Sequence, residues 1–293
     1  MKKILSLIAA SALLVSVFAG CGGSGGSGSS AASSAAGSSA ASSAAGSSAA
    51  ASSAAGSSAA SGKTFTVGFD KDFPPYGFVD DNGEFTGFDI ELAMEAAKRM
   101  GMTFKGQPID WDAKDMELQS GSIDCIWNGF TINGREDKYT WSKPYVNNSQ
   151  VFVVRKDSGI KTFDDLKGKI VSVQTDSSAQ EALNDEKNAA IKKSLKEIVT
   201  CKEYNTAFMD LQSGAIDAIA MDVGVAKYQI TTRKADFVVL EGSIADEQYG
   251  IGFLKGNTEL KDKVEAALTE MVKDGTFATI SKKYFNEDVG IFK

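Results

Sequence analysis

Nine residues occur twice in this chain, and the repeat constrains the fold more than any other feature. The sequence LQSGSIDCI at residues 118–126 returns as LQSGAIDAI at residues 211–219, with seven identical positions. Each copy has the pattern of a helix end, a glycine that terminates the helix, and a short apolar strand. The repeat predicts two α/β lobes of similar design that face each other across a cleft. The alternative is a chance match between two unrelated helix-to-strand junctions.

The first residues have the pattern of an export signal. Lys2 and Lys3 precede an apolar run over residues 4–17, which is short for a membrane span. The FAGC sequence that follows resembles the end of a bacterial lipoprotein signal, with Cys21 as the lipidated first residue of the mature chain. Phe18 departs from that pattern, in which leucine is usual three residues before the cysteine. The alternative is a transmembrane anchor.

A segment of very simple composition follows the cysteine. Residues 22–62 are all glycine, serine or alanine, so they have nothing to bury and cannot offset the entropy of ordering. A flexible coil of this length reaches about 35 Å, enough to carry a domain clear of a membrane surface. We therefore expect a signal peptide over residues 1–20 and a lipidated tether over 21–62. A glycosylated stalk is the alternative.

Residues 63–293 are long enough for two lobes with hydrophobic cores. The net charge of −7 becomes −9 without the two lysines of the signal, which argues against nucleic acid as a partner. The sequence has no histidine, which excludes histidine-assisted nucleophiles and ordinary zinc sites, so we expect no metal and no cofactor. With Cys21 assigned to lipid, Cys125 and Cys201 fall in different lobes, and we expect two buried thiols instead of a disulfide.

The first predicted strand leads into a recognisable helix. We expect a strand over residues 64–69, a turn-rich segment over 70–76, and a helix that begins at Asp89 as N-cap and ends at Gly101. Strand-to-loop edges of this kind are where α/β folds bind ligands. The apolar stripe of the helix consists of Ile90, Ala93, Met94 and Ala97.

Residues 87–100, GFDIELAMEAAKRM, fit the signature of the bacterial solute-binding proteins of ABC transporters that carry polar amino acids, known as family 3. The resemblance extends over nearly all of residues 63–293. It implies an α/β, two-lobed, periplasmic-binding-protein-like fold with a ligand cleft between lobes that two hinge crossings join. In that family the two lobes close around one amino acid.

The resemblance also places the lobes along the chain. It implies hinge crossings near residues 147–152 and 245–250, a first lobe over 63–149 plus 249–293, and a second lobe over 150–248. In the second lobe Thr162 and Asp165 have capping-box spacing before a strand at residues 170–174. Residues 260–285 read as terminal helices with a break at 274–276, packed on the first lobe.

Binding a free amino acid requires a group for its carboxylate. The GFTINGR segment resembles the family segment in which a threonine or serine and then an arginine hold the ligand, which implies roles for Thr131 and Arg135. A guanidinium offers two parallel N–H donors to a carboxylate. This segment is one residue shorter than the common family form. The alternative is a surface Arg135 paired with Glu136 or Asp137.

The second lobe is expected to complete the carboxylate site from the loop after its first strand. Gln174, Ser177 and Ser178 lie there, at the start of a predicted helix whose backbone N–H groups attract an anion. The alternative is that both serines are plain helix caps. Asp176 stands where many relatives have glycine, and its charge would repel a carboxylate unless it points outward.

The ammonium group and the side chain of the ligand need other partners. Asp222 ends the second copy of the repeat, where the family has an aspartate that binds the α-amino group, and the Gly129 carbonyl is a second acceptor. The alternative for Asp222 is a helix cap. Residues expected to contact the ligand side chain, with core packing as the alternative for the aromatic ones, are Asp70, Phe73, Tyr76, Trp111 and Asn128.

The predicted function is capture of a polar L-amino acid, basic or amide, by lobe closure and its delivery to an ABC permease. We expect a monomeric non-enzyme outside the cytoplasm, anchored to the cell membrane by lipid on Cys21. One alternative is a dehydratase on the same fold that uses Asp70 or Asp222 as an acid. Another is an adhesin or signalling lipoprotein that binds no small ligand.

Overall fold

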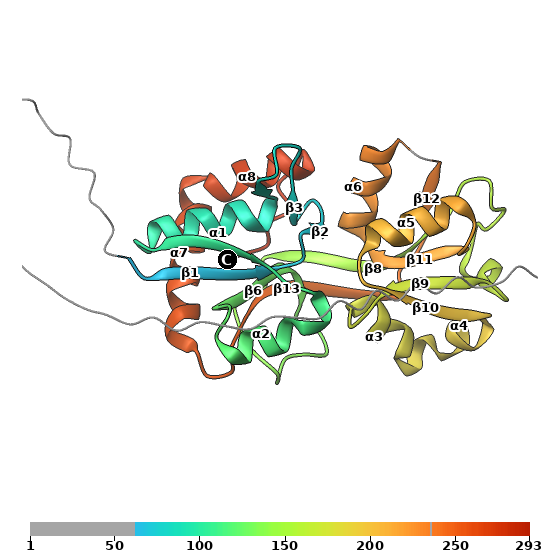
Figure 1. Cartoon of the computed structure of the whole chain (residues 1–293), viewed down its shortest axis with the longest axis horizontal. Helices are drawn as coiled ribbons and strands as arrows, with labels where there is room; N and C mark the ends of the chain where they lie inside the picture. The colour runs from blue at the N-terminus through green and yellow to red at the C-terminus, as the bar shows by residue number, and fades with distance from the viewer. Residues whose placement is uncertain (1–61, 235) are drawn as a thin grey trace, which may run out of the picture. The chain divides into compact units, whose positions relative to one another are not determined.

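A computed structural model describes residues 62–234 and 236–293 (Figure 1). The predicted signal peptide, the lipidation site at Cys21 and nearly all of the tether lie outside these residues. One sheet runs through the described part, in the strand order β10-β9-β11-β8-β13-β6-β1-β5, with β12 on β8 and β7 on β13. No helix in the described part is both long enough and apolar enough to cross a membrane.

Lobe 1 is an α/β unit around the β6-β1-β5 end of the sheet, whose strands are parallel. In Figure 1, α1 and α8 lie on one side of these strands and α2 on the other. The two terminal helices are separated at Gly275 and pack on α1, as predicted. The elements are β1 (Thr64–Phe69), β2 (Asp72–Phe73), β3 (Gly77–Val79), β4 (Phe85–Thr86), α1 (Phe88–Arg99), β5 (Thr103–Pro108), the 3-10 helix η1 (Trp111–Ala113), α2 (Lys114–Ser120), β6 (Cys125–Thr131), β7 (Thr140–Trp141), α7 (Thr258–Asp274) and α8 (Thr276–Phe285).

Lobe 2 is built around the β10-β9-β11 end, also parallel. In Figure 1, α5 and α6 lie on one side of it and α3 and α4 on the other. Thr162 and Asp165 form the predicted capping box, and the strand at residues 170–174 is present. The elements are η2 (Phe163–Leu166), β9 (Ile170–Gln174), α3 (Ser178–Asn184), η3 (Glu186–Asn188), α4 (Ala189–Ser194), β10 (Glu197–Cys201), α5 (Tyr204–Ser213), β11 (Ala218–Asp222), α6 (Val223–Arg233) and β12 (Phe237–Val239).

Two long antiparallel strands connect the lobes. These are β8 (Val146–Arg155) and β13 (Ala245–Phe253), which pair from Gln150 opposite Ala245 to Val146 opposite Tyr249. The predicted crossings at residues 147–152 and 245–250 overlap this paired segment, and the two-lobed fold is confirmed. The boundaries at residues 149/150 and 248/249 lie inside these strands and stay a prediction.

The repeated nine residues have the same structure in both lobes. Gly121 and Gly214 follow α2 and α5 with φ of 76° and 81°, a left-handed conformation that glycine adopts without strain. Two residues of the repeat then tie its strand to the first strand of the lobe. The Asp124 carboxylate accepts from the Thr66 N–H at 2.7 Å, and the Asp217 carboxylate accepts from the Ile170 N–H at 2.8 Å. The repeat therefore encodes one junction used twice.

The structure corrects two details of the first helix. Gly87 occupies the N-cap position of α1, and Asp89 is inside the helix and fully buried, where its Oδ2 accepts from the Gly129 N–H at 2.6 Å and from the Tyr145 hydroxyl at 2.8 Å. Met94 is 41% exposed, so it is not part of the apolar stripe.

Cys125 and Cys201 are free thiols in different lobes, as predicted, although Cys201 is only half-buried.

Candidate functional site

A cavity between the lobes collects ten of the twelve ligand-binding residues predicted from the sequence. Lobe 1 contributes from β2, η1, β6 and the loop after β6, and lobe 2 from the carboxyl ends of β9 and β11 and the start of α3. Such strand ends are the usual ligand sites of α/β folds. The lining residues are Phe73, Trp111, Asn128, Gly129, Thr131, Arg135, Gln174, Ser177, Ser178 and Asp222.

Gly129 has a left-handed backbone and close neighbours, a combination that favours glycine. Its φ is +56°, and a Cβ there would lie 3.0 Å from Phe73 and 3.2 Å from Tyr249. The Gly129 N–H donates to the buried Asp89 carboxylate, and this hydrogen bond fixes the orientation of the peptide. Asp89, which sequence reasoning treated as a cap, therefore positions the backbone of the cavity.

Arg135 is buried at the lobe interface. Its Nη1 donates to the Thr131 carbonyl at 3.4 Å, and its Nη2 lies 3.1 Å from Glu181 Oε2 on α3 of lobe 2. The latter is an ion pair without hydrogen-bond geometry, so the buried Nη2 has no hydrogen-bond partner among the described residues. The alternative of a surface arginine paired with Glu136 or Asp137 is wrong, and the guanidinium keeps a donor for an anion.

Asp222 lies on the lobe 2 side of the same cavity. Its Oδ1 accepts from Asn148 Nδ2 at 2.7 Å, from Gln150 Nε2 at 2.8 Å and from the Tyr249 hydroxyl. Its side chain makes no cap hydrogen bond to α6, although it precedes that helix. Burial, and the neighbouring carboxylate of Glu247, raise the pKa of Asp222 to about 7. A cation beside it would favour the ionised form.

Glu247 is the acidic residue of this region that sequence reasoning missed. It lies on β13 and is 6% exposed, and its Oε1 accepts from Asn148 and Gln150 on β8. The resemblance places a hinge crossing at residues 245–250, but only the pairing of β13 with β8 brings residue 247 beside residues that line the cavity. Its acidic character in a predicted crossing was the one available signal.

The two serines of lobe 2 have different roles. The Ser177 hydroxyl accepts from the Gln180 N–H at 3.2 Å and is the N-cap of α3, as the alternative interpretation had it. The Ser178 hydroxyl is not a cap; it lies 2.8 Å from Gln150 Nε2 and 3.2 Å from the Thr131 hydroxyl of lobe 1. Ser178 is thus one of the groups by which the lobes meet.

Asp176 is not among the residues that line the cavity. It adopts a left-handed conformation, with φ of 57°, that glycine adopts without strain. Its carboxylate forms an ion pair with the buried Lys114 of lobe 1. Because this lysine neutralises it, Asp176 does not oppose an anion near Arg135.

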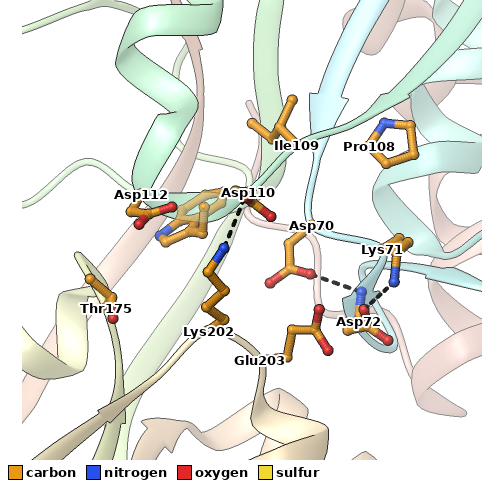
Figure 2. A pocket seen from close by; sticks show the side chains of 11 residues that line it. Asp70, Lys71, Asp72, Pro108, Ile109, Asp110, Asp112, Thr175, Lys202 and Glu203 are labelled. Carbon is orange, nitrogen blue, oxygen red and sulfur yellow. Dashed lines mark hydrogen bonds and ion pairs between the residues drawn. The ribbon is translucent and has the colours of Figure 1, made fainter. Parts of the chain in front are cut away.

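A second cavity adjoins the first at Trp111, which lines both. Figure 2 shows Asp70, Asp110 and Glu203 directed into it. Asp70 Oδ2 accepts from Gln174 Nε2 of lobe 2 at 2.7 Å, and burial raises the pKa of Asp70 to about 6. The charged lining residues are Asp70, Asp72, Asp110, Asp112, Glu203, Lys71 and Lys202, five carboxylates against two ammonium groups with a formal net charge of −3.

The remaining predicted contact, Tyr76, lines neither of these cavities. Its ring packs at 5.2 Å from that of Tyr249 and at 5.8 Å from that of Phe73, and it is 2% exposed. Phe73 itself lines the first cavity and packs at 6.1 Å from Tyr204 of lobe 2. Tyr76 therefore supports Phe73 from the side away from the cavity.

Comparison with known proteins agrees with this geometry. The profile of the bacterial extracellular solute-binding proteins, family 3, matches residues 65–287. The L-cystine-binding protein TcyJ of Escherichia coli (strain K12) is 34% identical over 230 residues, which cover 77% of this chain and 84% of that protein. The lysine/arginine/ornithine-binding periplasmic protein of the same strain is 32% identical over 236 residues, which cover 78% and 89%.

A solved structure gives the same result. The crystal structure of an ABC uptake transporter substrate binding protein from Streptococcus pneumoniae with bound histidine superposes with a TM-score of 0.75 at 36% identity, covering 78% of this chain and 94% of that chain. The agreement covers both lobes and the strands that join them. The chain belongs to family 3 of the bacterial extracellular solute-binding proteins.

Proposed function

We propose that this protein binds one L-amino acid with a cationic side chain between its lobes and delivers it to an ABC permease. The relatives named above bind amino acids, by their names, and the arrangement of charges here supports the same use. Arg135 holds the ligand carboxylate, and Asp222 with the Gly129 carbonyl holds its ammonium group. Phe73 and Trp111 contact the apolar part of the side chain, and Asn128, Gln174, Ser177 and Ser178 complete the lining.

The observation that carries the choice of ligand is the acidic second cavity. A side chain that passes Trp111 meets the five carboxylates around Asp70, and the cavity's net negative charge favours a cation there. An indole ring beside that path also favours a cation. Arginine, lysine and ornithine have this chemistry, whereas an apolar side chain would desolvate the carboxylates without compensation.

L-Cystine is the second candidate. Its far end carries both an ammonium and a carboxylate, and Lys71 and Lys202 stand among the acids of the second cavity. The lysines are engaged by acidic neighbours, at 2.6 Å to Asp72 and 3.1 Å to Asp110. A distal carboxylate would have to compete with those ion pairs, which favours the cationic ligands.

We also propose that the protein is a lipid-anchored, monomeric binding protein without enzymatic activity. The resemblance of the first residues to a lipoprotein signal, with Cys21 as the acylated residue and residues 22–62 as the tether, supports the anchor. The relatives named as amino-acid-binding proteins support a binding role over the dehydratase.

Calorimetric titration of the purified full chain tests the ligand. We expect L-arginine, L-lysine or L-ornithine to bind at least about tenfold more tightly than L-glutamine or L-cystine, a difference of about 1.4 kcal/mol. Asp70→Asn should reduce that preference, while Asp81→Asn, an exposed residue remote from both cavities, should not. Preference for cystine would select the second candidate, and no binding of any amino acid would refute the proposal.

A further inference from the structure

Glu247 lies at the meeting point of both lobes and the hinge. Its Oε1 lies 2.9 Å from the Thr131 hydroxyl of lobe 1 and 3.4 Å from the Ser178 hydroxyl of lobe 2. The same oxygen accepts from Asn148 Nδ2 at 2.7 Å and from Gln150 Nε2 at 2.8 Å, both on the other hinge strand. In the described part of the chain no lysine or arginine forms an ion pair with it. Hydrogen-bond donors alone therefore hold this buried carboxylate.

The hydrogens available in this network fix which way its hydroxyls point. A hydroxyl has one hydrogen, and an ionised carboxylate can only accept. Glu247 is the nearer of the two acceptors for Thr131, at 2.9 Å against 3.2 Å for the Ser178 oxygen, and a carboxylate is the stronger acceptor. The Thr131 hydrogen therefore goes to Glu247, and the oxygen has only lone pairs left for the cavity that it lines.

We propose that Glu247 is a positioning residue that makes the Asp222 end of the cavity accept hydrogen bonds only, so that the site selects a ligand with an α-ammonium group over one with an α-hydroxyl. The inference rests on the proposed binding of an amino acid in this cavity. An ammonium brings three N–H donors to Thr131, Asp222 and the Gly129 carbonyl. A hydroxyl brings one donor, and at pH 8, above the pKa of Asp222, its own lone pairs then face acceptors that it cannot satisfy.

The test compares L-arginine with its α-hydroxy analogue, 2-hydroxy-5-guanidinopentanoic acid, by calorimetric titration of the full chain. In Glu247→Gln the new amide can donate to Thr131, which frees the threonine hydrogen to turn toward the cavity. We expect the ratio of the two affinities to fall at least about tenfold, because unmatched buried polar groups dominate such discrimination. Asp246→Asn removes the same charge from an exposed neighbour on β13 and should leave the ratio unchanged.

A double-mutant cycle separates positioning from general damage. Thr131→Val should lower the ratio by itself, and adding Glu247→Gln to it should change the ratio less than about twofold, because Glu247 acts through Thr131. A merely structural role for Glu247 would weaken both ligands alike and leave the ratio constant.

Each outcome decides the matter. An unchanged ratio in Glu247→Gln, or additive effects in the cycle, would overturn the inference while the proposed function stands. If Glu247→Gln does not fold, the inference is overturned when Thr131→Val has the same ratio of the two affinities as the wild-type protein. A wild-type protein that binds neither L-arginine nor any other amino acid overturns the proposed function and the inference with it.

Discussion

At the scale of single residues, the cavity separates two opposite charges across the lobes. Arg135 comes from lobe 1 and Asp222 from the end of a lobe 2 strand, and both are at most 3% exposed. Asp222 has no cationic partner among the described residues, and the ion pair of Arg135 with Glu181 leaves its buried Nη2 without a hydrogen bond, so each of these groups gains from an ion of the other sign. An amino-acid zwitterion provides both ions at a fixed separation.

Arg135 provides the first prediction. Arg135→Lys keeps the charge but loses the forked pair of donors, so we expect ligand affinity to fall at least about tenfold, and about a hundredfold or more in Arg135→Ala. Glu181→Gln removes the ion-pair partner of Arg135 but no proposed ligand contact, and should cost much less. Titration calorimetry measures all three. Equal affinities in wild type and Arg135→Ala would refute the assignment.

The buried acids predict how stability depends on pH. Burial raises the pKa of Asp70 to about 6 and those of Asp89 and Asp222 to about 7. Between about pH 4 and 7 the folded protein therefore binds more protons than the unfolded chain, so the free energy of unfolding falls as pH rises through this window. We expect the ligand-free protein to have a higher Tm at pH 5.5 than at pH 8.

Thermal melts of wild type and Asp222→Asn at both pH values check this sign. The substitution removes one of the three ionisations, so it should raise the Tm at pH 8 and reduce the difference between the two values. Hydrogen bonds from Thr276 lower the pKa of Asp274 to about 2. Its contribution to the free energy of unfolding is complete above pH 4, so it does not affect this comparison. A wild-type Tm that rises from pH 5.5 to pH 8 would contradict the expectation.

At the scale of elements, the repeated junction predicts matched energetic effects in the two lobes. Gly121→Ala and Gly214→Ala place a Cβ on a left-handed residue with no atom closer than 3.6 Å, so backbone strain is the main cost. We expect each to destabilise by about 1 kcal/mol. Ser122→Ala installs the residue that the second copy already has, Ala215, and should stay within about 0.5 kcal/mol of wild type. Urea unfolding measures these changes, and a cost in only one lobe would show that the copies are not equivalent.

The same junctions show why the sequence predicts elements better than contacts. Helix ends, glycine exits and short strands leave local patterns, so the repeat and the terminal helices could be predicted, whereas the positions of both crossings followed from the resemblance to family 3. The burial of Asp89 against Gly129 depends on how α1 packs on β6, which no local pattern contains. Glu247 faces the site only through the register of β13 on β8, and Tyr76 is turned from the cavity by its packing on Tyr249.

At the scale of the whole molecule, several polar contacts join the lobes besides those at the cavity. Asn205 Nδ2 of lobe 2 donates to Asp72 of lobe 1 at 2.9 Å, and Lys202 pairs with Asp110 at 3.1 Å. Lys114 differs from these because its side chain is only 2% exposed, although its partner Asp176 is 49% exposed, so the lysine has little solvent to replace this carboxylate. Opening the lobes would leave Lys114 without this carboxylate, which makes the pair a contact specific to the closed form.

We therefore expect Asp176→Asn to change the closure of the lobes and not the selectivity among ligands. Loss of the charge should favour an open arrangement, increase the radius of gyration measured by X-ray scattering in the absence of ligand, and weaken all ligands by the same factor of about three to ten. The common factor follows because affinity falls with the fraction of molecules able to close, whatever the ligand. Asp157→Asn removes an exposed acid whose ion pair with Arg155 lies within lobe 2, and should change neither quantity. If Asp176→Asn weakened L-arginine but not the other ligands, Asp176 would belong to the binding site, and closure would be governed by other contacts.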